Sequence, residues 1–121
     1  MERKENKMTK IEAIVREEVY QDLLDALKSV DIHGITVSQV MGCGTQKGYT
    51  RRVRGSKVDI NMLPKIKFEI VVSSDAFADE VVRIIRKTAV TGQPGDGKIF
   101  VYDLKDVIRI RTNEHGVDAI N

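Results

Sequence analysis

Hydrophobic and polar side chains alternate in several short stretches of the chain, with the two-residue period of a half-buried strand. The clearest stretch covers 64–70, where Ile66, Phe68 and Ile70 share one face and charged residues take the other. Similar runs rich in β-branched and aromatic residues occur at 10–16, 35–41, 98–102 and 107–111. The pattern therefore predicts a sheet that buries at least one of its faces.

Two segments between these strands show helical spacing instead. Apolar residues recur at steps of three and four between 19 and 30, and again between 77 and 89. The second segment follows Ser73, Ser74 and Asp75, which are residue types that cap helices, and it ends with Arg86 and Lys87 near its negative pole. Both segments are predicted to be amphipathic helices.

The predicted order of strand, helix, strand, strand, helix, strand is that of a ferredoxin-like βαββαβ sandwich, an α+β fold. Such a fold places both helices on one face of an antiparallel sheet. The other face carries Ile14, Lys65, Lys67 and Glu69, a mixture that suits either solvent or a second copy of the chain. The length of 121 residues allows one domain, which we assign to 8–121, with 1–7 as a charged N-terminal extension.

The overall composition excludes several broad classes of protein. With 41% hydrophobic residues the chain can bury a core, which rules out a wholly disordered tail. No apolar run approaches the roughly 20 residues of a membrane helix, and the charged N-terminal residues do not resemble a signal peptide. The single cysteine, Cys43, is expected to be a structural thiol in a reducing compartment, so we predict a cytoplasmic protein.

A stretch rich in glycine and basic residues separates the second and third predicted strands. Between 42 and 61 it holds four glycines and five Lys or Arg residues against one acid, Asp59, which gives a net charge of +4. Loops of about 20 residues are uncommon in compact domains unless they carry a function. We therefore predict a functional loop without regular structure. Gln46, near its start, offers an amide oxygen suited to a hard cation.

A second glycine-rich stretch, 92–98, matches the first seven positions of the phosphate-binding P-loop. The match stops at Ile99, where the P-loop needs Ser or Thr for Mg²⁺, and a predicted strand follows where the P-loop runs into a helix. The P-loop interpretation is therefore rejected. Closely spaced glycines beside Lys98 still favour an anion site, and an ordinary connecting loop is the alternative.

Arg109 and Arg111 stand two residues apart in the last predicted strand, which places both guanidinium groups on one face. Such a pair suits a polyphosphate, and surface ion pairs with Asp or Glu are the alternative use. His33 and His115 have no partners at metal-ligand spacing, so we assign them to a turn and to the C-terminal tail. Without a catalytic triad, HExxH or CxxC pattern, an ordinary hydrolase or metalloenzyme has no site.

Four blocks of sequence combine these features in a fixed order. They are GTQKG at 44–48, LPKIK at 63–67, TG with GDGKIF within 91–100, and IRIRT at 108–112. Together they resemble the PII nitrogen-regulatory signal-transduction family, from about Met8 to Ile120 and at nearly the family's spacing. A single block such as GDGK would be weak evidence, whereas four ordered blocks over almost the whole chain are specific.

The resemblance implies a homotrimer that regulates other proteins and is not an enzyme, with ligand sites in the clefts between subunits. ATP and ADP would compete there, and Mg²⁺ and 2-oxoglutarate would join ATP. The matching positions for the phosphates are Gly95, Asp96, Gly97, Lys98, Arg109 and Arg111, and those for the base and ribose are Ile14, Thr36, Gly44 and Val71, with Thr45 and Gln46 also at the nucleotide. The positions for 2-oxoglutarate are Gln46, Lys47, Gly48 and Lys65, and Gln46 would also bind Mg²⁺.

The resemblance further implies that about 44–62 form a projecting T-loop that contacts partner proteins. The partners implied are an ammonium transporter at the membrane surface, glutamine synthetase, or a transcription regulator, and nucleic acid is not expected. Contact with the membrane would come only through the transporter. The residues that would meet these partners are Tyr49, Arg51, Arg52, Arg54, Ser56, Lys57 and Val58.

Three positions depart from the family pattern. Thr45 stands where an Arg commonly reaches the nucleotide phosphates, which affects discrimination between ATP and ADP. Val58 replaces the tyrosine that some bacterial members uridylylate, so that modification has no target at this position. Ser56 matches a serine that cyanobacterial-type members phosphorylate, although its neighbours differ. Effector binding is therefore expected to be the main switch.

Two other functions stay open on the residues alone. A ferredoxin-like nucleic-acid-binding module would use the basic loop, but it needs aromatic side chains on the central strands, and only Phe68 and Phe100 are available. A small enzyme of acylphosphatase-like shape would need a base or a nucleophile, and the sequence shows neither.

Overall fold

The computed structural model describes residues 7–45, 51–53, 56–58 and 60–120. The order of elements confirms the predicted alternation, with two added strands in the loop between the second and third predicted ones. The elements are β1 (Thr9–Arg16), a 3₁₀ turn (Glu17–Val19), α1 (Tyr20–Lys28), β2 (Ile35–Thr45), β3 (Arg51–Val53), β4 (Ser56–Val58), β5 (Ile60–Val72), α2 (Asp75–Ala89), β6 (Gly97–Asp103) and α3 (Val117–Ile120).

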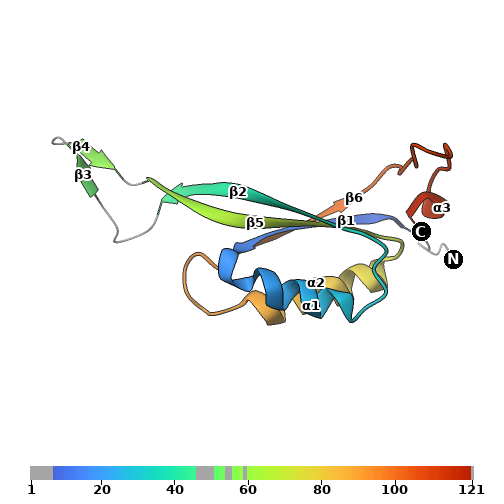
Figure 1. Ribbon diagram of the computed structural model, residues 1–121, viewed down its shortest axis with the longest axis horizontal. Coiled ribbons are helices and arrows are strands. Elements are labelled where there is room, and N and C mark those ends of the chain that lie inside the picture. Colours follow the sequence, from blue (N-terminus) through green and yellow to red (C-terminus); the bar gives the residue numbers. More distant parts are fainter. Residues whose placement is uncertain (1–6, 46–50, 54–55, 59, 121) are drawn as a thin grey trace, which may run out of the picture.

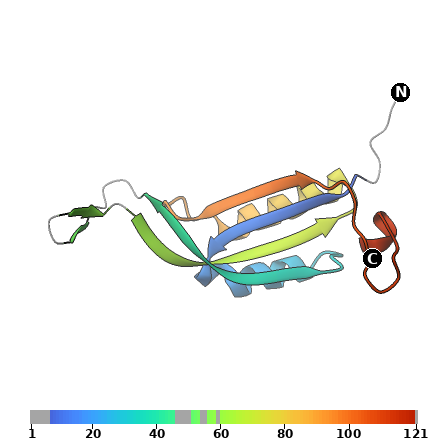
Figure 2. The same cartoon turned by 90° about the horizontal axis from the view of Figure 1, so that it is seen from above.

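Four strands form one sheet in the order β2-β5-β1-β6, and β3 pairs with β4 in a separate hairpin. Each neighbouring pair in the four-stranded sheet is antiparallel. Both long helices cover the same face of this sheet, and the opposite face is open (Figures 1 and 2). This arrangement confirms the ferredoxin-like βαββαβ fold.

The hydrophobic core lies between the helices and the covered face of the sheet. Burial alternates strictly along β1, where every second side chain from Thr9 onward is buried. Phe68 of β5, with no exposed surface, packs at the centre with Leu23 and Leu27 of α1 and Val81 of α2. The two-residue alternation that predicted the strands therefore also identified their buried faces correctly.

Helix α2 begins where its capping residues predicted. Ser74 is extended, and its hydroxyl oxygen accepts a hydrogen bond of 3.2 Å from the backbone N–H of Phe77. Arg86 and Lys87 lie in the last turn, where positive charge is favourable. In the described residues, the helices are all too short or too polar to cross a membrane.

The prediction of a strand at 107–111 is wrong. β6 is the fourth strand of the sheet and reaches the end of β1, where Asp103 pairs with Thr9. Beyond it the chain turns back on itself: the N–H of Asn113 donates to the carbonyl of Arg109, and Ile108 forms only an isolated bridge with His115. Arg109 and Arg111 therefore lie on a turn, and the argument that placed them on one strand face does not apply.

Strand pairing extends further into the basic segment than the sequence pattern predicted. β2 continues to Thr45, which pairs with Ile60 of β5, although the segment from Gly42 onward was expected to lack regular structure. Two antiparallel strands hydrogen-bond along their facing edges and leave the outer backbone groups to solvent, so strand pairing can continue beyond the hydrophobic core. The result is an arm that projects beyond the helices, with the β3–β4 hairpin near its tip (Figure 1).

Removal of the cap on α2 should lower stability without altering the fold. We expect Ser74→Ala to reduce the free energy of unfolding by about 1 kcal/mol, because the N–H of Phe77 loses its side-chain acceptor. Urea denaturation followed by circular dichroism measures the change. Ser73→Ala is the matched control and should stay within about 0.5 kcal/mol of the parent. An equal loss in the two variants would contradict the assigned cap.

Candidate functional site

The predicted binding residues gather at two opposite ends of the sheet. We call one the loop end, formed by Ile14, Lys65 and the 91–98 connection, and the other the tail end, formed by Thr36, Val71 and the 104–120 segment. In the β1–β6 pair, Ile14 lies opposite Lys98 and Thr9 lies opposite Asp103. Gly97 and Asp103 are six residue steps apart along β6, which at about 3.3 Å per step is about 20 Å. The two ends are therefore too far apart within one chain to hold the same phosphate group.

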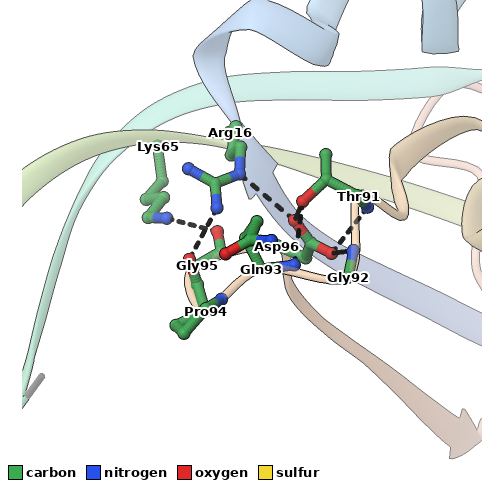
Figure 3. Close-up of polar contacts among 8 residues, drawn as sticks. All are labelled: Arg16, Lys65, Thr91, Gly92, Gln93, Pro94, Gly95 and Asp96. Atoms are coloured by element: carbon green, nitrogen blue, oxygen red, sulfur yellow. Dashed lines mark hydrogen bonds and ion pairs between the residues drawn. The ribbon is translucent and has the colours of Figure 1, made fainter. Parts of the chain in front are cut away.

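Asp96 organises the loop end. Its Oδ2 accepts hydrogen bonds from the backbone N–H groups of Thr91 (2.7 Å) and Gly92 (2.9 Å), and its Oδ1 accepts one from the Thr91 hydroxyl (2.5 Å). Figure 3 shows the carboxylate at the centre of these contacts. The hydrogen bond from the Thr91 hydroxyl, followed by the Thr91 backbone N–H, holds the pKa of Asp96 far below its usual range. Asp96 is therefore an ionised brace of the loop.

Two cations from neighbouring strands tie the same loop to the sheet. The Arg16 guanidinium at the end of β1 donates to Asp96 Oδ1 (3.2 Å) and to the Pro94 carbonyl (2.6 Å). The Lys65 ammonium on β5 donates to the Gly95 carbonyl at 2.8 Å. Three segments that are distant in the sequence thus meet at one glycine loop (Figure 3).

Gly95 and Gly97 allow the backbone to approach these groups closely. Both have positive φ, 99° and 106°, which side chains rarely adopt. A Cβ on Gly97 would lie 1.8 Å from the carbonyl oxygen of Ile14, so only glycine can begin β6 here. Lys98 follows at once and is exposed on the open face, beside Ile14. The loop end therefore combines glycine backbone without side chains and positive charge, as an anion site requires.

The tail end contains a groove of about 430 Å³. Thr36, Glu69 and Val71 line it from the sheet, and Leu104, Val107, Ala119 and Ile120 line it from the C-terminal segment. At its floor the Lys10 ammonium lies 2.8 Å from a carboxylate oxygen of Glu69. Their hydrogen bond raises the pKa of Lys10 and lowers that of Glu69. The groove thus combines apolar walls with a fixed charge pair, which suits the flat, polar-edged body of a nucleoside.

A compact turn in the C-terminal segment carries the two predicted phosphate-binding arginines. Asp106 closes its base: one carboxylate oxygen lies 2.8 Å from Nδ1 of His115, and the other accepts hydrogen bonds from the N–H groups of Val107 and Gly116. The contact with His115 is the largest cause of the lowered pKa of Asp106. Within the turn, Glu114 pairs with the guanidinium of Arg109. Arg111 is exposed.

The open face between the two ends carries paired charges. Glu12, in the middle of β1, accepts a hydrogen bond of 3.2 Å from the Tyr102 hydroxyl and lies 3.7 Å from the Lys67 ammonium. Phe100 and Tyr102 are exposed on this face, whereas Phe68 is fully buried on the other. Phe68 is therefore not available for base stacking, which removes one of the two aromatic residues that a nucleic-acid-binding module would have used.

Comparison with known proteins identifies the family. The family model described as nitrogen regulatory protein P-II matches residues 8–114. The nitrogen regulatory protein P-II of Pasteurella multocida is 50% identical over 113 residues, which cover 93% of this chain and all of the relative. Nitrogen regulatory protein P-II 1 of Methanothermobacter thermautotrophicus is also 50% identical, over 93% of this chain and 97% of its own. The chain belongs to the P-II family.

Solved P-II structures share this fold. The complex of Bacillus subtilis GlnK with ATP has a TM-score of 0.79 and 35% identity, and covers 97% of this chain and 99% of its own. Arabidopsis thaliana PII bound to citrate has a TM-score of 0.73 and 39% identity, and covers 96% and 92%. P-II proteins are regulators and not enzymes, as the sequence predicted.

The structure brings only part of the predicted site together. Gly95, Asp96, Gly97 and Lys98 adjoin Ile14 and Lys65 at the loop end, while Thr36 and Val71 lie with the arginine turn at the tail end. Gly44 lies further along the β2–β5 ribbon, opposite Asn61. The predictions for Gln46, Lys47, Gly48, Tyr49 and Arg54 lie outside the described residues. The backbone of Thr45, Arg51, Arg52, Ser56, Lys57 and Val58 is in strands.

Sequence reasoning missed Arg16. Its alternation with Ile14 places it on the open face, but its partners Pro94 and Asp96 are about 80 positions away along the chain. Only the pairing of β1 with β6 shows that the end of β1 adjoins the glycine loop. Arg16 could have been found from the sequence only by predicting that β1 pairs with β6 and then noting that Arg16 is the last polar residue of β1.

The ionised state of Asp96 should make the glycine loop sensitive to acid. The pKa of Asp96 in the folded protein lies below its ordinary value of 3.8. Ionised Asp96 therefore contributes its full stabilisation of the folded state above about pH 3.8, and this contribution is lost as the pH falls towards the folded-state pKa. Asp96→Asn should therefore unfold at a lower temperature than the parent at pH 7, and the gap should narrow below about pH 4. Thermal unfolding at a series of pH values measures it.

Asp79→Asn on the exposed surface of α2 is the matched control, and its difference from the parent should be small at every pH. A gap between parent and Asp96→Asn that stays constant from pH 7 to pH 3 would contradict the account of Asp96.

Proposed function

We propose that this chain is a trimeric PII-type signalling protein that binds ATP or ADP in the clefts between its subunits. The observation that carries the proposal is the separation of the two half-sites on one chain. Gly95, Gly97 and Lys98 lie at the loop end, whereas Arg109 and Arg111 lie beyond the other end of β6. A polyphosphate contacted by both groups must lie between two copies, so that the loop end of one subunit faces the tail end of the next.

The open face of the sheet supports assembly from copies of the chain. The charged side chains in the middle of this face are already paired within the chain, Lys10 with Glu69 and Lys67 with Glu12. Burying charges costs less when each already has a partner. Phe100 and Tyr102 of the edge strand β6 are 41% and 44% exposed and supply apolar surface beside these pairs. A homotrimer would cover this face.

Each half-site would bind a different part of the nucleotide. Lys98 and the N–H groups of Gly95 and Gly97 would bind phosphate oxygens, as would Arg109 and Arg111 from the neighbouring subunit. Thr36 and Val71 in the tail-end groove would contact the base and ribose, with Ile14 approaching from the other side of the cleft. Asp96 takes a different role from the one that the family pattern suggested: it would shape the loop, because its carboxylate is already bound to Thr91, Gly92 and Arg16.

Lys65 is suited to link nucleotide to 2-oxoglutarate. Its ammonium now donates to the Gly95 carbonyl, within the loop that would bind phosphate. A dicarboxylate that drew Lys65 away would therefore act on the same loop. In our proposal 2-oxoglutarate joins Mg-ATP, with Gln46 on the metal and on the ligand, and with the backbone at Lys47 and Gly48 completing the site. The citrate bound to the Arabidopsis PII shows that a member of the family accepts a polycarboxylate.

The β2–β5 ribbon would carry the signal to a partner. Gln46 and Lys47 directly follow β2 at Thr45, so a ligand bound there acts on the base of the T-loop. The T-loop would then select among an ammonium transporter, glutamine synthetase and a transcription regulator, in the cytosol or at the membrane surface through the transporter. With Val58 in place of a modifiable tyrosine, effectors would control this choice, and Ser56 is a further candidate for phosphorylation.

Two lysine substitutions should separate the ligand sites. We expect Lys98→Ala to weaken ATP and ADP by roughly tenfold or more, because a charged contact to phosphate is lost. Lys65→Ala should chiefly abolish the 2-oxoglutarate response and leave ADP binding within about threefold of the parent. Isothermal titration calorimetry with each nucleotide, and with 2-oxoglutarate in the presence and absence of Mg-ATP, measures both effects.

Lys87→Ala on the exposed last turn of α2 is the control for loss of one positive charge, and it should bind every effector like the parent. Two results would contradict the proposal: effector binding by Lys98→Ala and Lys65→Ala that equals the control, or 2-oxoglutarate binding by the parent that is independent of Mg-ATP.

A further inference from the structure

The carboxylate of Glu114 already binds Arg109, an arginine that the proposed function needs for binding phosphate. Its carboxylate pairs with the Arg109 guanidinium, and the same oxygen accepts a hydrogen bond of 2.7 Å from the Thr112 hydroxyl. A second nitrogen of Arg109 donates to the backbone carbonyl of Asp118 at 3.1 Å. The guanidinium is thus held by its own turn and by α3, and its side chain is only 27% exposed.

The turn is built to keep this carboxylate in place. The N–H of Arg109 donates to the Glu114 carbonyl at 2.9 Å, and the Glu114 N–H donates to the Thr112 hydroxyl at 3.2 Å. Asn113, between them, adopts a positive φ of 59°, which reverses the chain. Backbone and side chain of Glu114 therefore both engage the turn, and the carboxylate is fixed beside Arg109 before any ligand arrives.

A polyphosphate at Arg109 would meet a negative charge already there. Phosphate and carboxylate oxygens prefer the same guanidinium donors, so the ligand must share or displace Glu114. The two anions also repel each other, and this repulsion grows with the charge of the ligand. A triphosphate without Mg²⁺ carries one more negative charge than the corresponding diphosphate, so it is penalised more.

We propose that Glu114 is a specificity-determining residue that weakens nucleotide binding and weakens ATP more than ADP. The inference rests on the proposed nucleotide site. Arg111, exposed on the same turn, makes no hydrogen bond or ion pair among the described residues, so the restraint acts on one arginine of the pair. Because Mg²⁺ neutralises part of the triphosphate charge, it narrows the difference between ATP and ADP.

The test compares Glu114→Gln with the parent as full-length protein. Glutamine keeps the length of the side chain and an amide oxygen that accepts from Thr112 and Arg109, so the turn is preserved while the charge is removed. Calorimetric titration with ATP and with ADP in a buffer that contains EDTA should show about tenfold tighter ATP binding and a gain of about threefold or less for ADP. In excess Mg²⁺ the gain for ATP should fall towards that for ADP.

Asp118→Asn is the matched control, because it removes the same charge from the same segment while its backbone carbonyl still accepts from Arg109. Its affinities should stay within about twofold of the parent. If Glu114→Gln binds like Asp118→Asn, or binds more weakly than the parent, the inference is overturned and the proposed function stands. If the parent binds neither nucleotide, the proposed function fails and the inference with it.

Discussion

The pairing of β1 with β6 is the constraint on which the candidate site depends. This pairing fixes the glycine loop beside Ile14 at one end of the sheet. At the other end, about 20 Å away, β6 leads into the arginine turn. A hydrogen-bonded ladder in a packed sheet does not bend to close such a distance. In the function we propose, a polyphosphate site that uses both groups can be completed only by a second chain, which would make assembly a condition of binding. The regulatory role of the P-II family is consistent with that requirement, because a ligand in a shared cleft acts on two subunits at once.

The electrostatics of the two half-sites differs. At the loop end, Asp96 is negative but fully engaged, and it positions the backbone of the glycine loop while Arg16 and Lys65 supply positive charge around it. At the tail end, Glu114 restrains Arg109. In our proposal the carboxylate of Asp96 shapes its half-site, whereas the carboxylate of Glu114 would oppose the ligand. Asp96 and Glu114 would therefore have opposite effects on binding, although each lies beside a residue that we propose to bind phosphate.

Much of the fold could be predicted from the sequence because local patterns determine it. Alternation in β1 and β5 identified their buried faces, and the serine before α2 identified where that helix begins. The strand predicted at 107–111 was wrong because alternation of Ile and Arg reports side-chain direction and says nothing about whether a partner strand exists. The place beside β1 that the last strand of this fold takes was already filled by β6, so 107–111 was not needed as a strand of the sheet. Arg16 was missed for a related reason, since its partners come into reach only through the strand order. The basic segment was predicted to lack regular structure because it shows no hydrophobic periodicity. Part of it is nevertheless paired as a two-stranded ribbon, which can form without that periodicity.

The central claim is that each nucleotide site takes its glycine loop from one subunit and its arginines from another. Subunit mixing tests it directly: Lys98→Ala and Arg109→Ala chains are unfolded together, refolded as a mixture and titrated with ATP. Each variant alone should bind poorly. By random assortment about one quarter of all clefts in the mixture should regain an intact loop end and an intact tail end, and these should bind ATP with the parent's affinity. A mixture that binds no better than the two variants measured separately would contradict the account.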